Sequence, residues 1–218
     1  MIQACIFDLD GVLVDTAKYH FVAWSELAGK LKIPFTEADN ERLKGVSRMD
    51  SLEIILELGN LQLSEAEKIE LAAEKNERYL ELISSMNPDE VLPGVIDFLE
   101  EVRKQELKTA LGSASKNAKQ ILDRTALHSF FDVVVDGTDI SKAKPDPQVF
   151  LTGANRLGIL PEHCVVFEDA VAGIKAAHNA GMRCVGIGSE KQLADTDIVI
   201  PGFDVISPGR FLDILLND

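Results

Sequence analysis

The sequence predicts an α/β protein that has a parallel sheet and an all-helical segment inserted after the first strand. Short runs rich in valine and isoleucine recur along the chain, and they indicate buried strands. Helical periodicity fills most of the gaps between these runs, which is the pattern of helices that cross over between parallel strands. After the first run, however, only helical patterns occur from Thr16 to about Asn87, and this long stretch indicates the insertion.

The apolar runs supply the predicted strands, which are in chain order Ile2–Phe7, Leu107–Gly112, Asp132–Asp136, Cys164–Glu168, Arg183–Gly188 and Asp197–Ile200. Outside the insertion, the predicted helices are Val95–Lys104, Asn117–Thr125, Pro147–Leu157 and Ala170–Ala180. Each of these helices follows a strand or a turn, and several end near glycine or proline, which are common helix stops.

The insertion is predicted to hold helices with leucine, isoleucine and tyrosine at three-to-four-residue spacing, namely Thr16–Leu31, Glu37–Lys44, Arg48–Leu58 and Ser64–Ser84. Ser64 and Glu67 have the spacing of a capping box at the start of the longest helix. Short turns lead into and out of the insertion and suit hinges between two rigid bodies. We therefore expect a core of residues 1–15 and 88–218 and a helical cap of residues 16–87.

Composition limits the possible functions. The chain has 218 residues, 46% of them hydrophobic, so it can bury a full core. Its net charge of −14 argues against nucleic acid as a partner, because proteins that bind nucleic acid present a basic surface. The sequence shows neither a membrane-spanning stretch nor a signal-peptide pattern, so we expect a cytoplasmic protein without a membrane partner. No heptad seam stands out, and a monomer is expected.

The three cysteines, Cys5, Cys164 and Cys184, lie inside apolar runs and lack the spacing of a zinc site. An odd number of cysteines without a motif does not suggest a disulfide framework. Buried, reduced thiols are therefore expected.

Two acidic residues, Asp8 and Asp10, follow the first predicted strand and precede Gly11. Ligands of open α/β sheets bind at the carboxyl ends of the strands, so these acids are candidates for an active site. An ordinary Asp-Gly turn would give the same short pattern. The rest of the chain distinguishes the two interpretations.

Three further polar clusters lie near the ends of later strands. Ser113, Ala114, Ser115, Lys116 and Asn117 combine hydroxyls, a lysine and the start of a helix, which is a pattern typical of a phosphate cradle. A helix N-cap would explain the serine alone. Lys144 precedes a proline on a stiff loop, and the pair Glu168 and Asp169 ends another strand. A lysine in a loop is by itself a weak signal, since most are solvated.

Paired carboxylates at strand ends favour Mg²⁺, which takes oxygen ligands from carboxylates, water and phosphate. Asp8, Asp169 and a backbone carbonyl would suffice to hold it. A carboxylate beside such a metal, with lysine and serine donors opposite, is equipped to attack phosphorus and to become an acyl phosphate.

In this order, Asp8-x-Asp10-Gly11-Val12, Ser113, Lys144-Pro145 and Glu168-Asp169 resemble the four motifs of the haloacid dehalogenase superfamily. The resemblance implies a Rossmann-like core with a helical cap inserted after the first strand. It also implies that Asp8 is the nucleophile and Asp10 the general acid and base, with Ser113 and Lys144 assisting. The metal set would comprise Asp8, Asp10, Glu168 and Asp169, with direct ligation by Glu168 left open. The acid at Asp10 is typical of the phosphoryl-transfer members.

The predicted cap adds candidate substrate contacts. Thr16, His20 and Trp24 share one helix face, where Trp24 could simply pack inside the cap and His20 could reach Asp10. A second cluster, Lys44, Gly45, Val46, Ser47, Arg48 and Ser51, surrounds a turn that enters a helix. Ser47 could act only as an N-cap, but Arg48 is suited to a phosphate, because its planar fork can bind two oxygens.

These cap segments, together with Lys75-Asn76 and Ser113–Asn117, resemble the β-phosphoglucomutase group of the superfamily. The resemblance implies that Arg48 and Ser115-Lys116-Asn117 hold the non-reacting phosphate, while Lys44, Gly45, Val46, Ser51 and Lys75 surround the sugar. A solvated lysine is an equally simple interpretation of Lys75. The implied reaction interconverts β-D-glucose 1-phosphate and glucose 6-phosphate. A Mg²⁺-dependent sugar-phosphate phosphatase is the alternative, and a non-catalytic sugar-phosphate sensor is a more distant one.

Overall fold

The computed structural model describes residues 1–193 and 196–217. Its centre is a parallel sheet with the strand order β3-β2-β1-β4-β5-β6. The strands are β1 (Ala4–Phe7), β2 (Lys108–Gly112), β3 (Val133–Val135), β4 (Cys164–Glu168), β5 (Arg183–Ile187) and β6 (Ile198–Ile200). The chain runs outward in both directions from β1 and β4, so their carboxyl ends form the switch point at which such sheets bind ligands.

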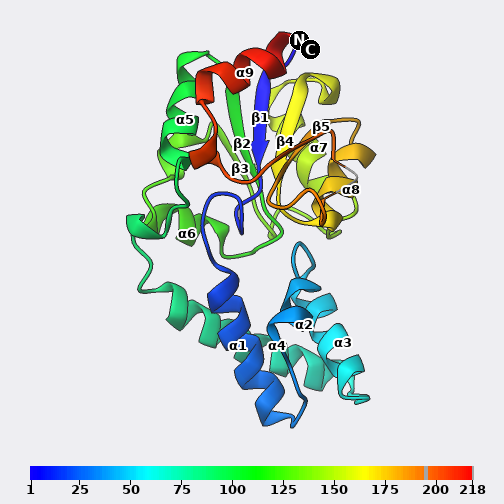
Figure 1. The fold of residues 1–218 in the computed structure, drawn as a ribbon. Coiled ribbons are helices and arrows are strands. Elements are labelled where there is room, and N and C mark those ends of the chain that lie inside the picture. The colour runs from blue at the N-terminus through cyan, green and yellow to red at the C-terminus, as the bar shows by residue number, and fades with distance from the viewer. Residues whose placement is uncertain (194–195, 218) are drawn as a thin grey trace.

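Helices cover both faces of the sheet (Figure 1). One face packs against α5 (Val95–Lys104), α6 (Ala118–Arg124) and α9 (Pro208–Asn217). The other face packs against α7 (Gln148–Leu157) and α8 (Val171–Asn179). Successive residues of β1 point to opposite faces, so Phe7 joins the first apolar cluster and Ile6 the second. The strands are buried on both sides, which explains their continuous apolar sequences.

The insertion after β1 contains α1 (Ala17–Lys30), α2 (Glu37–Glu41), α3 (Arg48–Leu58) and α4 (Glu65–Ile83), which are called the cap below. Figure 1 shows the cap beyond the carboxyl ends of the strands. It has its own apolar interior, made by Trp24, Leu27, Ala28, Ile33, Leu43, Leu52, Ile55, Leu56 and Ala72. Ser64 and Glu67 form the predicted capping box at the start of α4.

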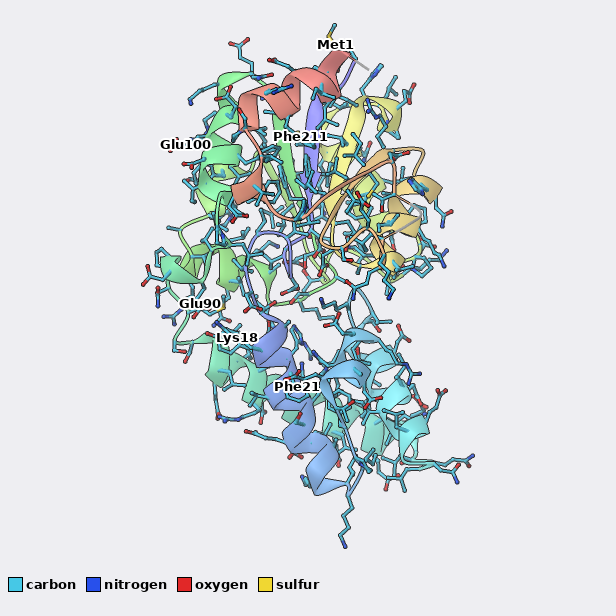
Figure 2. All side chains as sticks on the ribbon, viewed as in Figure 1. Met1, Lys18, Phe21, Glu90, Glu100 and Phe211 are labelled. Atoms are coloured by element: carbon cyan, nitrogen blue, oxygen red, sulfur yellow. The ribbon has the colours of Figure 1, made fainter. Side chains whose placement is uncertain are left out.

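The two chain crossings between cap and core lie side by side. Val14 and Val91 form an isolated antiparallel bridge. Next to it, the Glu90 carboxylate accepts a hydrogen bond of 2.5 Å from Lys18 Nζ and one of 2.9 Å from the Tyr19 hydroxyl. Figure 2 labels Lys18 and Glu90 at this junction. The start of α1 is thereby fastened to the chain that returns from the cap. The structure also has short 3₁₀ helices at Pro88–Glu90, His128–Phe130, Pro161–His163 and Phe203–Val205.

The predicted fold class is confirmed. Three predicted elements, Arg48–Leu58, Val95–Lys104 and Cys164–Glu168, have the observed bounds, and the others differ at their ends by up to three residues. The sequence prediction omitted α9, which covers the sheet beside α5. All three cysteines are free and buried, as expected. Within residues 1–193 and 196–217, no helix has both the length and the apolar character needed to cross a bilayer.

Candidate active site

Asp8 is the first residue after β1, and the adjacent strands hold it in place. Its backbone N–H donates to the carbonyl of Phe167 on β4 at 2.9 Å. Its carboxylate accepts the backbone N–H of Asp10 at 3.0 Å, which closes the turn after the strand. Gly11 follows with a φ of +78°, a left-handed conformation that glycine adopts without strain. The Asp8-Gly11 segment is thus a turn, but one that presents carboxylates at the switch point of the sheet.

Lys144 connects two of the predicted acids. Its ammonium lies 2.5 Å from Asp8 Oδ1 and 2.7 Å from Glu168 Oε2, and the Lys144 side chain is completely buried. The two carboxylates raise the pKa of Lys144 far above its usual range, although burial acts in the opposite direction. Lys144 is therefore a fixed positive charge beside Asp8, and not a solvated loop lysine.

Asp8, Glu168 and Asp169 form a compact acidic cluster in which one oxygen from each residue lies within 4.8 Å of the others. Burial raises the pKa of both Glu168 and Asp169, and the charge of Asp8 acts in the same direction. Lys144 and Lys44 offset only part of this charge. Carboxylate oxygens that lie this close together, with a negative charge that the lysines only partly balance, fit a hard divalent cation such as Mg²⁺. Asp10 has its carboxylate outside this cluster.

The Asp10 carboxylate instead accepts a hydrogen bond from the hydroxyl of Thr16, at the entrance to α1. Burial and the charge of Asp8 raise the pKa of Asp10 to about 7, while the Thr16 hydrogen bond acts against them. Asp10 can therefore carry a proton at neutral pH. This property suits a group that must both donate and accept a proton.

A cavity of about 510 Å³ lies between the cap and the core. Its lining includes Asp8, Asp10 and Asp169, which follow β1 and β4. It also includes Arg48 from the start of α3 and residues 114–117 from the loop after β2. Further predicted contacts that line the cavity are Thr16, His20, Trp24, Lys44, Gly45, Val46, Ser47, Ser51 and Lys75. The fold thus brings together acidic and basic residues far apart in the sequence around one cavity.

The cavity lining also contains cations. Arg48 and Lys116 line the cavity, and neither has an ion-pair partner among the described residues. Ser47 is the N-cap of α3, as one interpretation of the sequence expected. Its side chain accepts a hydrogen bond from the backbone N–H of Asp50. Asn117 donates to Asn76 of the cap at 3.0 Å and so links α4 to the loop after β2. Unpaired cations in a cavity are suited to an anion such as a phosphate.

A packed group of cap side chains, Lys75, His20 and Trp24, also lines the cavity. Lys75 is 3% exposed, so it is not the solvated lysine that the sequence left open. Its Nζ lies 3.0 Å from His20 Nδ1 and 4.5 Å from the centre of the Trp24 ring. Burial, followed by the charge of Arg48, lowers the pKa of Lys75 to about 7. Burial, followed by Lys75, holds the pKa of His20 well below its usual range.

Some predicted residues lie elsewhere than expected. His20 pairs with Lys75, and Thr16 is the residue that bonds Asp10. Trp24 is 2% exposed and packs in the cap interior as well as lining the cavity. Ser113 is completely buried outside the cavity lining, where its Oγ accepts the N–H of Ser115 at 3.1 Å.

Lys44 approaches the acids from the cap, at 3.4 Å from Asp169. Two lining residues, Asn76 and Tyr79, carry polar side chains to which the sequence analysis gave no role. Their positions on α4 could have indicated that they lie near Lys75, because Asn76 follows Lys75 directly and Tyr79 lies one helical turn after it.

The comparisons with known proteins agree with this geometry. Residues 2–181 match the family described as haloacid dehalogenase-like hydrolase. The chain is 46% identical over 200 residues to the β-phosphoglucomutase of Bacillus subtilis (strain 168), covering 91% of this chain and 88% of that protein. It is 36% identical over 218 residues to the phosphorylated carbohydrates phosphatase of Thermotoga maritima, covering 98% of each. A crystal structure of β-phosphoglucomutase from Clostridium difficile matches with a TM-score of 0.94 and 40% identity, covering 100% of this chain and 98% of that one.

Proposed function

Because the chain belongs to the haloacid dehalogenase-like hydrolase family, we propose that it is a phosphoryl-transfer enzyme, and specifically a β-phosphoglucomutase. In this proposal it interconverts β-D-glucose 1-phosphate and glucose 6-phosphate through glucose 1,6-bisphosphate. The observation that carries the proposal is a single cavity whose lining holds both the Asp8 carboxylate and the unpaired cations Arg48 and Lys116. In this proposal the two phosphates of a bisphosphate bind at these two groups, and the bisphosphate can bind in either of two orientations.

In the first half-reaction, a carboxylate oxygen of Asp8 forms a bond to the phosphorus of the bisphosphate, and the bond from phosphorus to the sugar oxygen breaks. Asp10 gives its proton to that leaving oxygen. In the second half-reaction, a hydroxyl of the sugar attacks the phosphorus on Asp8, and Asp10 accepts the proton of that hydroxyl. General acid and base catalysis of this kind is worth about 10²–10⁴-fold in rate.

The positive charges of the site serve this transfer. Lys144 lies 2.5 Å from Asp8, where it offsets the repulsion between the carboxylate and an incoming phosphoryl group. Asp8, Glu168 and Asp169 would hold Mg²⁺, which when bound adds positive charge at the transferring phosphoryl oxygens. Arg48 and residues 115–117 would hold the other phosphate, so that the sugar lies along Lys75 and His20.

A phosphatase that works on sugar phosphates is the second candidate, and the likeness to the Thermotoga maritima phosphatase supports it. The same residues would form the aspartyl phosphate, but water would then attack it. A mutase must exclude water until the sugar has bound, which depends on how the cap closes.

Phosphorus NMR separates the two candidates. The protein is incubated with Mg²⁺, β-D-glucose 1-phosphate and a trace of glucose 1,6-bisphosphate, and the incubation is repeated with the α-anomer. The proposal predicts glucose 6-phosphate from the β-anomer alone. Release of inorganic phosphate as the main product would instead identify a phosphatase.

A further inference from the structure

One hydrogen bond beside the cavity joins the core to the cap. Asn117 Nδ2, at the end of the loop after β2, donates to Asn76 Oδ1 on α4 at 3.0 Å. Both asparagines line the cavity and are partly buried. Away from the two chain crossings, the side-chain hydrogen bonds and ion pairs that join cap and core within residues 1–193 and 196–217 are this bond and the Lys44–Asp169 pair. Asn76 therefore helps to set how the cap sits on the core.

Local structure explains neither asparagine. Asn76 lies in the middle of α4, where asparagine is a weaker helix former than the alanine, glutamate, lysine and leucine that make up most of this helix. Asn117 is the N-cap residue of α6, a position at which an asparagine side chain usually accepts a backbone N–H of the helix. Here it makes no such bond, and its amide donates to the cap instead. Each residue gives up a local advantage for the same contact, which indicates a role beyond helix formation.

The bond ends on the loop that would hold the second phosphate. The backbone N–H of Asn117 donates to Ser115 Oγ at 3.2 Å, and the backbone N–H of Ser115 donates to Ser113 Oγ at 3.1 Å. These bonds fix the conformation of the loop. Asn76 thus fixes the position of a preformed loop relative to the cap, and the cap in turn carries Arg48 in the lining of the same cavity.

We propose that Asn76 is a positioning residue that makes the site selective for substrates with a second phosphate. Through its bond to Asn117, it keeps Arg48 of the cap at a spacing from the core loop that one phosphate can bridge. Asn76 does not touch the phosphoryl group that reacts at Asp8, so its effect is confined to substrates that reach both groups. The inference rests on the proposed function, in which Arg48 and residues 115–117 hold the non-reacting phosphate.

The test compares two phosphoryl donors in the presence of Mg²⁺. Glucose 1,6-bisphosphate has a second phosphate, whereas acetyl phosphate has only the one that is transferred. In Asn76→Ala, rapid-quench measurements should show that the bisphosphate concentration for half-maximal phosphorylation of Asp8 rises about three- to tenfold, which is the effect of one hydrogen bond. The maximal rate should stay within about twofold of the wild-type value, because binding weakens equally before and in the transition state. Acetyl phosphate should phosphorylate both proteins at the same rate.

The variant is expected to fold, because alanine is the better helix former and offsets the lost bond. Urea unfolding should accordingly show little change in stability. Asn155→Ala is the matched control, because Asn155 lies on α7, is exposed and does not line this cavity. It should leave the reactions with both donors unchanged.

A double-variant cycle shows whether Asn76 acts through Asn117. Asn117→Ala should weaken bisphosphate binding by itself, since it removes both the bond and a proposed phosphate contact. Adding Asn76→Ala to it should weaken binding little further. If Asn76 instead contacted the phosphate directly, its replacement would weaken binding in the Asn117→Ala protein as well.

Two results would overturn the inference while leaving the proposed function intact. One is an Asn76→Ala variant that affects the two donors equally or affects neither, and the other is a double variant whose losses multiply. If the wild-type protein accepts phosphate from neither donor, the proposed function fails, and the inference fails with it.

Discussion

Lys144 Nζ lies 2.5 Å from Asp8 Oδ1, although 136 residues separate the two in the sequence. Both side chains are buried, and Lys144 also bonds Glu168. A buried lysine between two carboxylates stabilises the fold as well as serving its proposed catalytic role, because each buried charge depends on the other.

Replacement of this lysine should destabilise the fold. In Lys144→Met, Asp8 and Glu168 lose their cation, and the free energy of unfolding should fall by about 3–5 kcal/mol. Urea unfolding measures this change, and a chelator is added so that no bound metal ion contributes to stability. The double variant Lys144→Met with Glu168→Gln should recover part of the loss. Wild-type stability in Lys144→Met would contradict the role of this ion pair.

Replacement of the proposed nucleophile should abolish the phosphoenzyme. Asp8→Asn keeps the size of the side chain but removes the anionic oxygen that forms the acyl phosphate. Intact-protein mass spectrometry after incubation with acetyl phosphate should show an added phosphoryl group in the wild-type protein and none in the variant. Asp97→Asn, an exposed substitution on α5, should behave like the wild type. A phosphorylated Asp8→Asn would remove Asp8 from the mechanism.

Replacement of Arg48 in the cavity lining should separate two activities. Arg48→Ala removes a charged contact to the second phosphate, which we expect to lower kcat/KM for the mutase reaction by about 10- to 100-fold. Hydrolysis of a small monophosphate ester, which has no second phosphate, should change little. Arg42→Ala, an exposed neighbour outside this cavity, is the control. Equal loss of both activities in Arg48→Ala would refute the phosphate role.

The buried lysine of the cap should make stability depend on pH. The pKa of Lys75 is about 7 in the fold, against an ordinary value of 10.5. Between these values the unfolded chain binds more protons than the folded one, so stability at this site rises with pH and is lowest below about pH 7.

Lys75→Met should therefore stabilise the protein most near pH 7, and this gain should shrink towards pH 10.5. Urea unfolding at several pH values measures the difference. Lys30→Met, on the exposed surface of α1, should show no such trend. A gain for Lys75→Met that grows with pH would contradict the assigned direction of the shift.

The sequence predicted the core of the fold well for a physical reason. Strands buried on both faces need continuous apolar runs, and β4 was predicted with its observed ends. The insertion was recognisable because its helices follow β1 without another strand. In contrast, α9 was missed, although its apolar residues Phe211, Leu212 and Leu215 have helical spacing and pack on the sheet.

The candidate site was only partly predictable. Asp8 and Asp169 follow strands, so the parallel topology alone brings them to one edge of the sheet. The contacts of Lys75 depend instead on how α4 packs against α1, which periodicity cannot specify. Periodicity equally could not show that Ser113 is turned into the protein, where it accepts the backbone N–H of Ser115.

The central claim is that the phosphate of the product comes from Asp8 and not from the same substrate molecule. A crossover experiment tests it: β-D-glucose 1-phosphate with heavy carbon in the sugar and heavy oxygen in the phosphate is mixed with unlabelled substrate. The account predicts glucose 6-phosphate in which the two labels are separated, because each sugar receives a phosphate left on Asp8 by another turnover. Glucose 6-phosphate in which the labels stay together, or labelled inorganic phosphate as the main product, would contradict it.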